Sequence, residues 1–219
     1  VKLRVVQEGP EDGPLVILLH GFPEFAYSWR RQIPYLVSKG FRVWAPDQRG
    51  YNLSDKPEEI ISYTTKELAA DVVGLIDAAG AEKAYLVGHD WGGSVAWRVA
   101  REYPDRLSKM VILNAPHGEV FRKEIRNNFS QLLRSWYIFF FQIPWLAEFI
   151  ASLGNWGVAE SILKNSSLPG TFSQRELKQY REAWSQPNAY RSMINWYRAL
   201  FQNQPNAQKI ASRVSVPTL

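Results

Sequence analysis

The chain has 219 residues, of which 46% are hydrophobic and 21% are charged, the balance of an ordinary globular domain. The net charge of +5 is mild, and Lys and Arg usually stand beside Asp or Glu, so we expect no nucleic-acid partner. The absence of cysteine excludes disulfide bonds and thiolate chemistry.

Short apolar runs alternate with amphipathic segments through the first half of the chain. Residues 15–19, 41–45, 84–87 and 110–113 are predicted strands, and residues 27–39, 65–79 and 94–100 are predicted helices. Strands that alternate with helices of this length favour an α/β class in which a mostly parallel sheet carries helices on both faces.

The pattern changes after residue 115, where strand-like runs disappear and aromatic residues become dense between Pro and Gly breaks. A strand-like run then restarts at Val214. We interpret residues 1–115 as the first part of a core, residues 116–206 as an inserted helical cap, and residues 207–219 as the start of the remaining core.

One stretch, residues 135–153, is apolar enough to raise the question of a membrane segment. Gln142, Pro144 and Glu148 interrupt it, so the uninterrupted part is too short to cross a bilayer. We predict a buried helix that faces a pocket, with a peripheral membrane contact as the alternative. No transmembrane segment or signal peptide is expected, and the predicted location is cytoplasmic.

The run Gly88-His89-Asp90-Trp91-Gly92-Gly93 lies between a predicted strand and a predicted helix. A strand, a tight Gly-x-Asp-x-Gly turn and a helix together are typical of a nucleophile elbow, with Asp90 where such turns usually carry serine. The alternative is an Asp that caps the helix of an ordinary turn.

A second motif, His20-Gly21-Phe22-Pro23-Glu24, follows the first strongly apolar strand. In a hydrolase sheet with such an elbow, one oxyanion-hole N–H comes from the loop after an early strand, and another comes from the residue after the nucleophile. These positions predict the backbone N–H groups of Phe22 and Trp91 as the oxyanion hole. A plain turn at the end of the strand is the alternative for this motif alone.

With both motifs in hand, the chain resembles the epoxide hydrolases of the α/β-hydrolase superfamily, along essentially its whole length. The motifs that carry the resemblance are His20-Gly21-Phe22-Pro23-Glu24, Asp47-Gln48-Arg49-Gly50-Tyr51, Gly88-His89-Asp90-Trp91-Gly92-Gly93 and Asn195-Trp196-Tyr197-Arg198.

The resemblance implies hydrolysis of a small apolar epoxide by water through a covalent alkyl ester on Asp90. It also implies that two cap tyrosines, Tyr137 and Tyr197, protonate the epoxide oxygen. A phenol has a pKa of about 10, so it is protonated at neutral pH and can donate. Two ordinary aromatic residues at the cap boundary are the alternative. No cofactor and no metal are expected, and the sequence does not indicate an oligomeric state.

Hydrolysis of the ester needs a base and an acid that orients it, and the family places both after the strand that begins near Val214. We do not expect the base among His20, His89 and His117. His20 is expected to hold the oxyanion loop, His89 to point away from the nucleophile, and His117 to lie at the entry to the cap. The expectation is therefore that the sequence is a truncated copy or covers only part of a longer protein.

Two other functions remain open. A haloalkane dehalogenase shares the Asp-Trp elbow but needs N–H donors for a halide, and Phe22 lacks a side-chain donor. A ligand-binding protein without catalysis could use the same scaffold.

Overall fold

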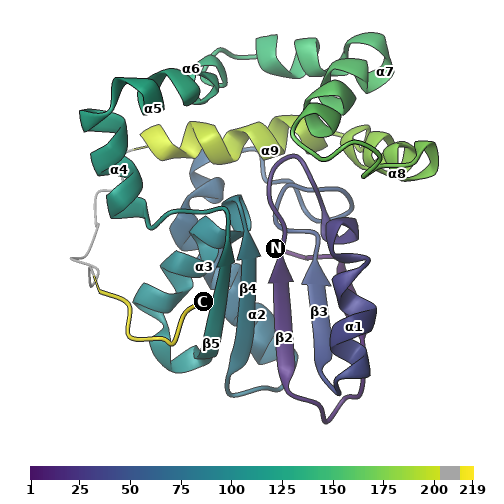
Figure 1. Cartoon of the computed structure of the whole chain (residues 1–219), viewed down its shortest axis with the longest axis vertical. Helices are drawn as coiled ribbons and strands as arrows, with labels where there is room; N and C mark the ends of the chain where they lie inside the picture. The colour runs from purple at the N-terminus through teal and green to yellow at the C-terminus, as the bar shows by residue number, and fades with distance from the viewer. Residues whose placement is uncertain (203–212) are drawn as a thin grey trace.

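The computed structural model describes residues 1–202 and 213–219, and its centre is a twisted five-stranded sheet in the order β1-β3-β2-β4-β5 (Figure 1). The strands are β1 (Val5–Glu8), β2 (Leu15–Leu19), β3 (Arg42–Pro46), β4 (Ala84–His89) and β5 (Leu107–Leu113). All neighbouring pairs are parallel except β1 with β3, so the predicted mostly parallel sheet is confirmed.

The strand β1 was not expected from the sequence. Its four residues, Val-Val-Gln-Glu, do not alternate, and it lies at an edge where only one neighbour is needed. By contrast β2 is buried along its whole length, which explains its continuous run of Leu, Val and Ile.

Helices cover both faces of the sheet, as predicted. Ile17 of β2 packs in one apolar cluster with Val72 and Val95, which belong to α2 (Thr65–Ala78) and α3 (Trp91–Glu102). Leu18 points to the other face and joins a second cluster with Ile33 of α1 (Gln32–Ser38). Successive side chains of a strand point to opposite faces, so a single strand supplies both clusters.

The single helix predicted over residues 27–39 is wrong in detail. The segment forms a 3₁₀ turn at Ala26–Trp29 and then the separate helix α1. Pro34 has no N–H to donate to the carbonyl of residue 30, so the α-helical ladder cannot continue back into the turn.

In the described part of the chain, the helices after β5 lie above the end of the sheet toward which the parallel strands point (Figure 1). They are α4 (Gly118–Asn127), α5 (Phe129–Arg134), α6 (Trp136–Phe140), α7 (Leu146–Asn165), α8 (Gln174–Trp184) and α9 (Ala189–Arg198). The limits of the predicted cap, 116–206, stay a prediction, and the boundary near residue 206 lies outside the described residues.

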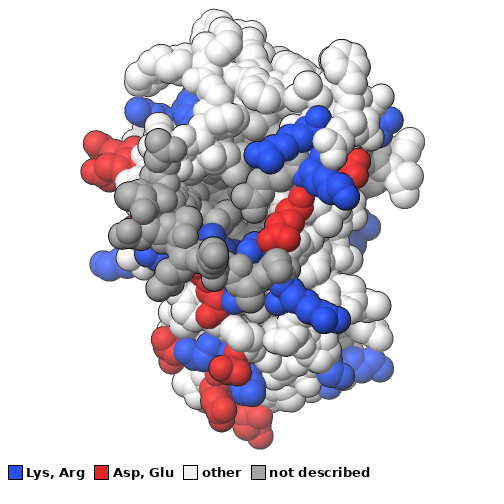
Figure 2. All heavy atoms as spheres, turned by 90° about the vertical axis from the view of Figure 1, so that its left-hand side faces the viewer, with Lys and Arg blue, Asp and Glu red and all other residues white. Residues whose placement is uncertain are grey.

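The expectation that residues 135–153 form a buried helix is wrong. The stretch is divided between α6 and α7, and Trp136, Trp145 and Phe149 are 61%, 65% and 62% exposed. Figure 2 shows this upper end of the molecule largely without charged side chains. Within the described part of the chain, no helix has the length and the apolar run that crossing a bilayer requires.

The segment after residue 213 lies beside β5, where the sequence predicts a restarting strand. The N–H of Met110 donates to Pro217 O at 2.9 Å, and the N–H of Leu219 donates to Met110 O at 3.0 Å. Thr218 forms one parallel bridge to Met110. The N–H of Ile112 also donates to Leu219 O at 2.9 Å. In the described residues, the strand predicted to restart at Val214 is therefore represented by this one parallel bridge.

Candidate active site

Two loops meet at the end of the sheet below α9. Leu19 at the end of β2 is paired in parallel with Gly88 near the end of β4, so the chain leaves both strands at the same edge. The loop after β2 carries Phe22, and the turn after β4 carries Asp90. The topology therefore brings together two motifs that are 68 residues apart.

Asp90 occupies the tip of the turn between β4 and α3. Its φ of 52° and ψ of −118° are rare for a residue with a side chain, and such strain typically costs about 1–3 kcal/mol. The N–H of Asp90 donates to Leu113 O at 3.0 Å, and its carbonyl accepts from Ser94 at 3.1 Å. Both neighbours hold the strained backbone in place.

Glycines allow the loops to approach this closely. A Cβ on Gly21 would lie 2.5 Å from the Asp90 Cβ, and a Cβ on Gly92 would lie 2.3 Å from Leu19 O. Neither position has room for a methyl group, so the close packing of the two loops requires glycine at both positions.

The Asp90 carboxylate faces the two predicted oxyanion donors. The Phe22 N–H donates to Asp90 Oδ1 at 2.9 Å, and the Trp91 N–H is also hydrogen-bonded to this carboxylate. Burial raises the pKa of Asp90, while these two donors and the nearby His89 lower it. The residues are together as expected, and their role in the reaction stays a prediction.

His20 lies under the loop that carries Phe22 and is fully buried. The backbone N–H of Gln48 donates to His20 Nε2 at 3.0 Å, so the proton is on Nδ1, which lies 3.0 Å from Gly21 O. Burial lowers the pKa of His20 to about 4, so the ring is neutral at pH 7. This contact geometry matches the expectation that His20 holds the loop.

The two other histidines are engaged elsewhere. His89 Nδ1 lies 3.7 Å from a Glu24 carboxylate oxygen. Burial raises the pKa of Glu24, and Tyr180 donates to it at 3.1 Å. The His117 ring packs edge-on against Trp97 at 5.2 Å, where the chain enters α4.

The two predicted tyrosines come from separate helices, Tyr137 from α6 and Tyr197 from α9, and their ring centroids are 5.9 Å apart. Tyr197 is buried, with its ring centroid 5.0 Å from Trp91 and 5.2 Å from Phe22. Tyr137 is 37% exposed. Tyr197 thus packs against Phe22 and Trp91, and Tyr137 lies beside it.

The pKa values of both phenols respond to Asp90. Burial raises the pKa of Tyr197 well above its ordinary value and also raises that of Tyr137, and the charge of Asp90 adds to both increases. Both hydroxyls are therefore protonated at neutral pH. A group that must donate a proton is in the required state.

Three side chains of α8 and α9 donate to loops at the end of the sheet, and nothing in the sequence indicated these contacts. Trp196 Nε1 donates to Arg49 O at 3.0 Å, Trp184 Nε1 donates to Pro23 O at 2.7 Å, and Tyr180 donates to Glu24. Aromatic density in the cap was visible, but their core partners lie 147 to 161 residues away in the sequence.

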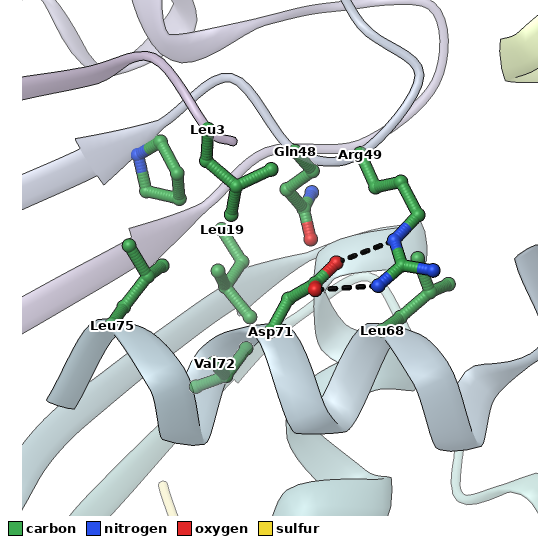
Figure 3. Close-up of a pocket in the computed structure, with 9 residues that line it drawn as sticks. Leu3, Leu19, Gln48, Arg49, Leu68, Asp71, Val72 and Leu75 are labelled. Carbon is green, nitrogen blue, oxygen red and sulfur yellow. Dashed lines mark hydrogen bonds and ion pairs between the residues drawn. The ribbon is translucent and has the colours of Figure 1, made fainter. Parts of the chain in front are cut away.

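Arg49 also anchors its own loop to α2. Its guanidinium makes two hydrogen bonds to Asp71, at 2.8 and 2.6 Å (Figure 3). A third goes to Ser62 O at 2.7 Å. The pair lies beside Leu68, Val72 and Leu75 of the same helix, in a space with room for about one water molecule. The Arg49–Asp71 pair supports the loop whose Arg49 carbonyl accepts from Trp196. The space beside the pair is too small to hold a substrate.

Across residues 1–202 and 213–219, no group of three or more His, Asp or Glu side chains is placed to hold a metal ion.

A model of the alpha/beta hydrolase fold family matches residues 14–208, so the chain belongs to that family. Its relatives place it among the epoxide hydrolases. It is 38% identical to epoxide hydrolase 4 of Homo sapiens, covering all of this chain and 61% of the human protein. A solved structure of an epoxide hydrolase from metagenomes of hot environments superposes with a TM-score of 0.83 at 36% identity, covering 99% of this chain and 76% of that one.

A bacterial relative is more similar in sequence. The AB hydrolase superfamily protein YfhM of Bacillus subtilis is 46% identical over 91% of this chain and 70% of its own length. The chain therefore spans between about six and seven tenths of these two curated relatives.

Proposed function

We propose that the protein hydrolyses epoxides to vicinal diols through a covalent ester on Asp90. The main support is the placement of Asp90 against the Phe22 N–H at 2.9 Å, with Tyr197 packed over Phe22 and Trp91. A nucleophile below and proton donors above are the two groups that ring opening requires.

In the first step an Asp90 carboxylate oxygen attacks an epoxide carbon, and the carbon–oxygen bond of the ring breaks. The released oxygen takes a proton from Tyr137 or Tyr197. The charge of Asp90 raises the pKa of both phenols, and that charge disappears as the ester forms. Attack therefore makes the phenols better acids at the moment when the proton is needed.

In the second step water attacks the carbonyl carbon of the Asp90 ester. The oxyanion that forms on residue 90 is stabilised by the N–H groups of Phe22 and Trp91, which already face this carboxylate. The resemblance assigns activation of the water to a base and an acid after the strand near Val214. The attacking water gives up one proton to the base, and collapse of the intermediate breaks the ester bond, so that the diol leaves with one proton and the Asp90 carboxylate is restored. The proton left over from the water returns to the tyrosine that was deprotonated in the first step.

The substrate we propose is a small apolar epoxide, because the side chains around Asp90 are mostly aromatic. Phe22 packs with Phe141, Tyr190 and Tyr197 at centroid distances of 5.2 to 5.9 Å. The proposed location, cytoplasmic, rests on the sequence alone.

The test offers the protein racemic styrene oxide together with 1-bromohexane as a competing substrate, and measures epoxide loss, diol formation and bromide release. We expect loss of epoxide and appearance of the Asp90 ester or the diol, without bromide release. Bromide release without epoxide loss would favour the haloalkane dehalogenase. Reversible binding of either compound, without chemistry, would favour a binding protein.

A further inference from the structure

The two tyrosines must reach the same epoxide oxygen, although they lie on different helices and are sixty residues apart in the sequence. A misplacement of about 1 Å can cost 10²-fold in rate, so the distance between α6 and α9 matters for the proposed reaction. The contacts of Arg198, the residue after Tyr197, bear directly on that distance.

Arg198 reaches from the end of α9 to the turn that follows α6. Its side chain is 9% exposed. Nε donates to Phe141 O at 2.9 Å, and Nη2 donates to Ile143 O at 3.2 Å. The guanidinium therefore binds the backbone only a few residues after Tyr137.

Acidic and amide groups complete the contacts of this guanidinium. Nη1 and Nη2 donate to the two oxygens of Glu148, on the first turn of α7, at 2.7 and 3.2 Å. Nη1 also donates to Asn195 Oδ1 at 3.2 Å. All five N–H groups of the guanidinium thus have an acceptor. This arrangement depends on the planar shape of arginine, and the ammonium group of a lysine could not make the same set of hydrogen bonds.

Two neighbours extend the contact to the tyrosines themselves. Gln142 Nε2 donates to Ile138 O at 2.9 Å in α6 and to Tyr197 O at 3.3 Å in α9. The Phe141 ring lies 4.8 Å from Tyr197 and 5.8 Å from Tyr137, so it packs against both rings, which also contact each other. Arg198 binds the backbone carbonyl of Phe141.

We propose that Arg198, with Glu148, is a positioning residue that fixes Tyr137 relative to Tyr197 by clamping α9 to the turn after α6. The inference rests on the proposed function for its kinetic consequence. Its structural consequence, the separation of the two rings, does not depend on activity.

The test compares R198K with R181K. Arg181 of α8 pairs with Glu160 of α7, so R181K also weakens a partly buried ion pair between cap helices, but away from the tyrosines. Single-turnover consumption of styrene oxide is measured for each variant, alone and combined with Y137F, and the R198K and R181K proteins are crystallised.

We expect R198K to slow ring opening between about 10-fold and 100-fold, and R181K to change it less than 2-fold. In the Y137F background R198K should slow ring opening little further, because one of the two hydroxyls that it aligns is already absent. The ring separation of 5.9 Å should increase in R198K alone. Should R198K not fold, E148Q should give the same pattern with a smaller effect.

Equal rates for R198K and R181K, additive effects of R198K and Y137F, or an unchanged ring separation would overturn the clamp. If the unsubstituted protein consumes no epoxide, the proposed function fails, and the clamp is then decided by the ring separation in the crystals.

Discussion

The two halves of the candidate site are built in different ways. On the core side Asp90, Phe22 and Trp91 are related by backbone atoms: strand pairing, one strained turn and N–H donors. On the cap side Tyr137 and Tyr197 are related by side chains, through ring packing and the contacts of Arg198.

This difference predicts which substitutions should change each side of the site. Most side-chain changes leave backbone N–H donors in place, so the core side should change mainly through the nucleophile or through groups that hold its loop. The cap side depends on side chains, and each of them can be altered separately. The predictions below test this contrast, from the largest expected effect to the smallest.

Substitution of Asp90, the proposed nucleophile, should have the largest effect. Asp90→Asn keeps the shape of the side chain but lacks the charged oxygen that attacks, so styrene oxide consumption should fall on the order of 10⁴-fold or more. Asp12→Asn, at an exposed turn, is the control and should leave the rate unchanged. A D90N rate close to the parent rate would reassign the attack to another group.

Removal of both phenols should have the next largest effect. The double variant Y137F/Y197F should slow ring opening by about 10²–10⁴-fold, the usual contribution of general acid catalysis, and each single variant less. Tyr35→Phe, at an exposed position, serves as the control. An unchanged rate in the double variant would limit both residues to packing.

Acid should weaken the core side through His20. Its pKa is about 4 in the folded protein, below the ordinary 6.5, so the unfolded chain binds the proton more strongly between these values. The contribution is fully present above pH 6.5 and is lost as the pH falls to 4, up to about 3 kcal/mol in the free energy of unfolding.

Urea unfolding of the parent protein and of His20→Asn at several pH values from 7 to 4 measures this contribution. The variant should be less stable at pH 7, and the difference between the two proteins should shrink as the pH falls. A constant difference across this range would contradict the neutral, buried state of His20.

The smallest effect is expected at a link between the halves. Trp196→Phe keeps an aromatic ring but removes the N–H that donates to Arg49 O. Loss of this hydrogen bond should lower the free energy of unfolding by about 1 kcal/mol, measured by thermal unfolding. A loss of several kcal/mol would mean that the ring, rather than its N–H, carries the contact.

The same contrast explains what the sequence could predict. The turn at Asp90 and the loop at Phe22 are short motifs in which glycine spacing and flanking strands carry the geometry, so the proximity of Asp90, Phe22 and Trp91 could be predicted, while their roles stay a prediction. The tyrosines could be named only by resemblance. The contacts of Arg198 and Trp196 could not be found, because nothing local in the sequence indicates acceptors 50 or 147 residues away.

Exposure in the cap was mispredicted for a related reason. An apolar run such as residues 135–153 gives the composition of a helix but not which neighbours will cover it. Its Trp136, Trp145 and Phe149 remain exposed. Apolar runs predicted strands β2 to β5 because these strands are paired inside or beside the buried sheet, whereas the edge strand β1 was missed.

The covalent ester on Asp90 is the central claim, and the mass of one peptide tests it most directly. Trypsin should release residues 84–98, in which Asp90 is the only side-chain carboxylate. After a single turnover with styrene oxide in ¹⁸O-water, this peptide should carry the epoxide as an ester or, after hydrolysis, one ¹⁸O atom. An unmodified, unlabelled peptide together with ¹⁸O in the diol would contradict the covalent mechanism.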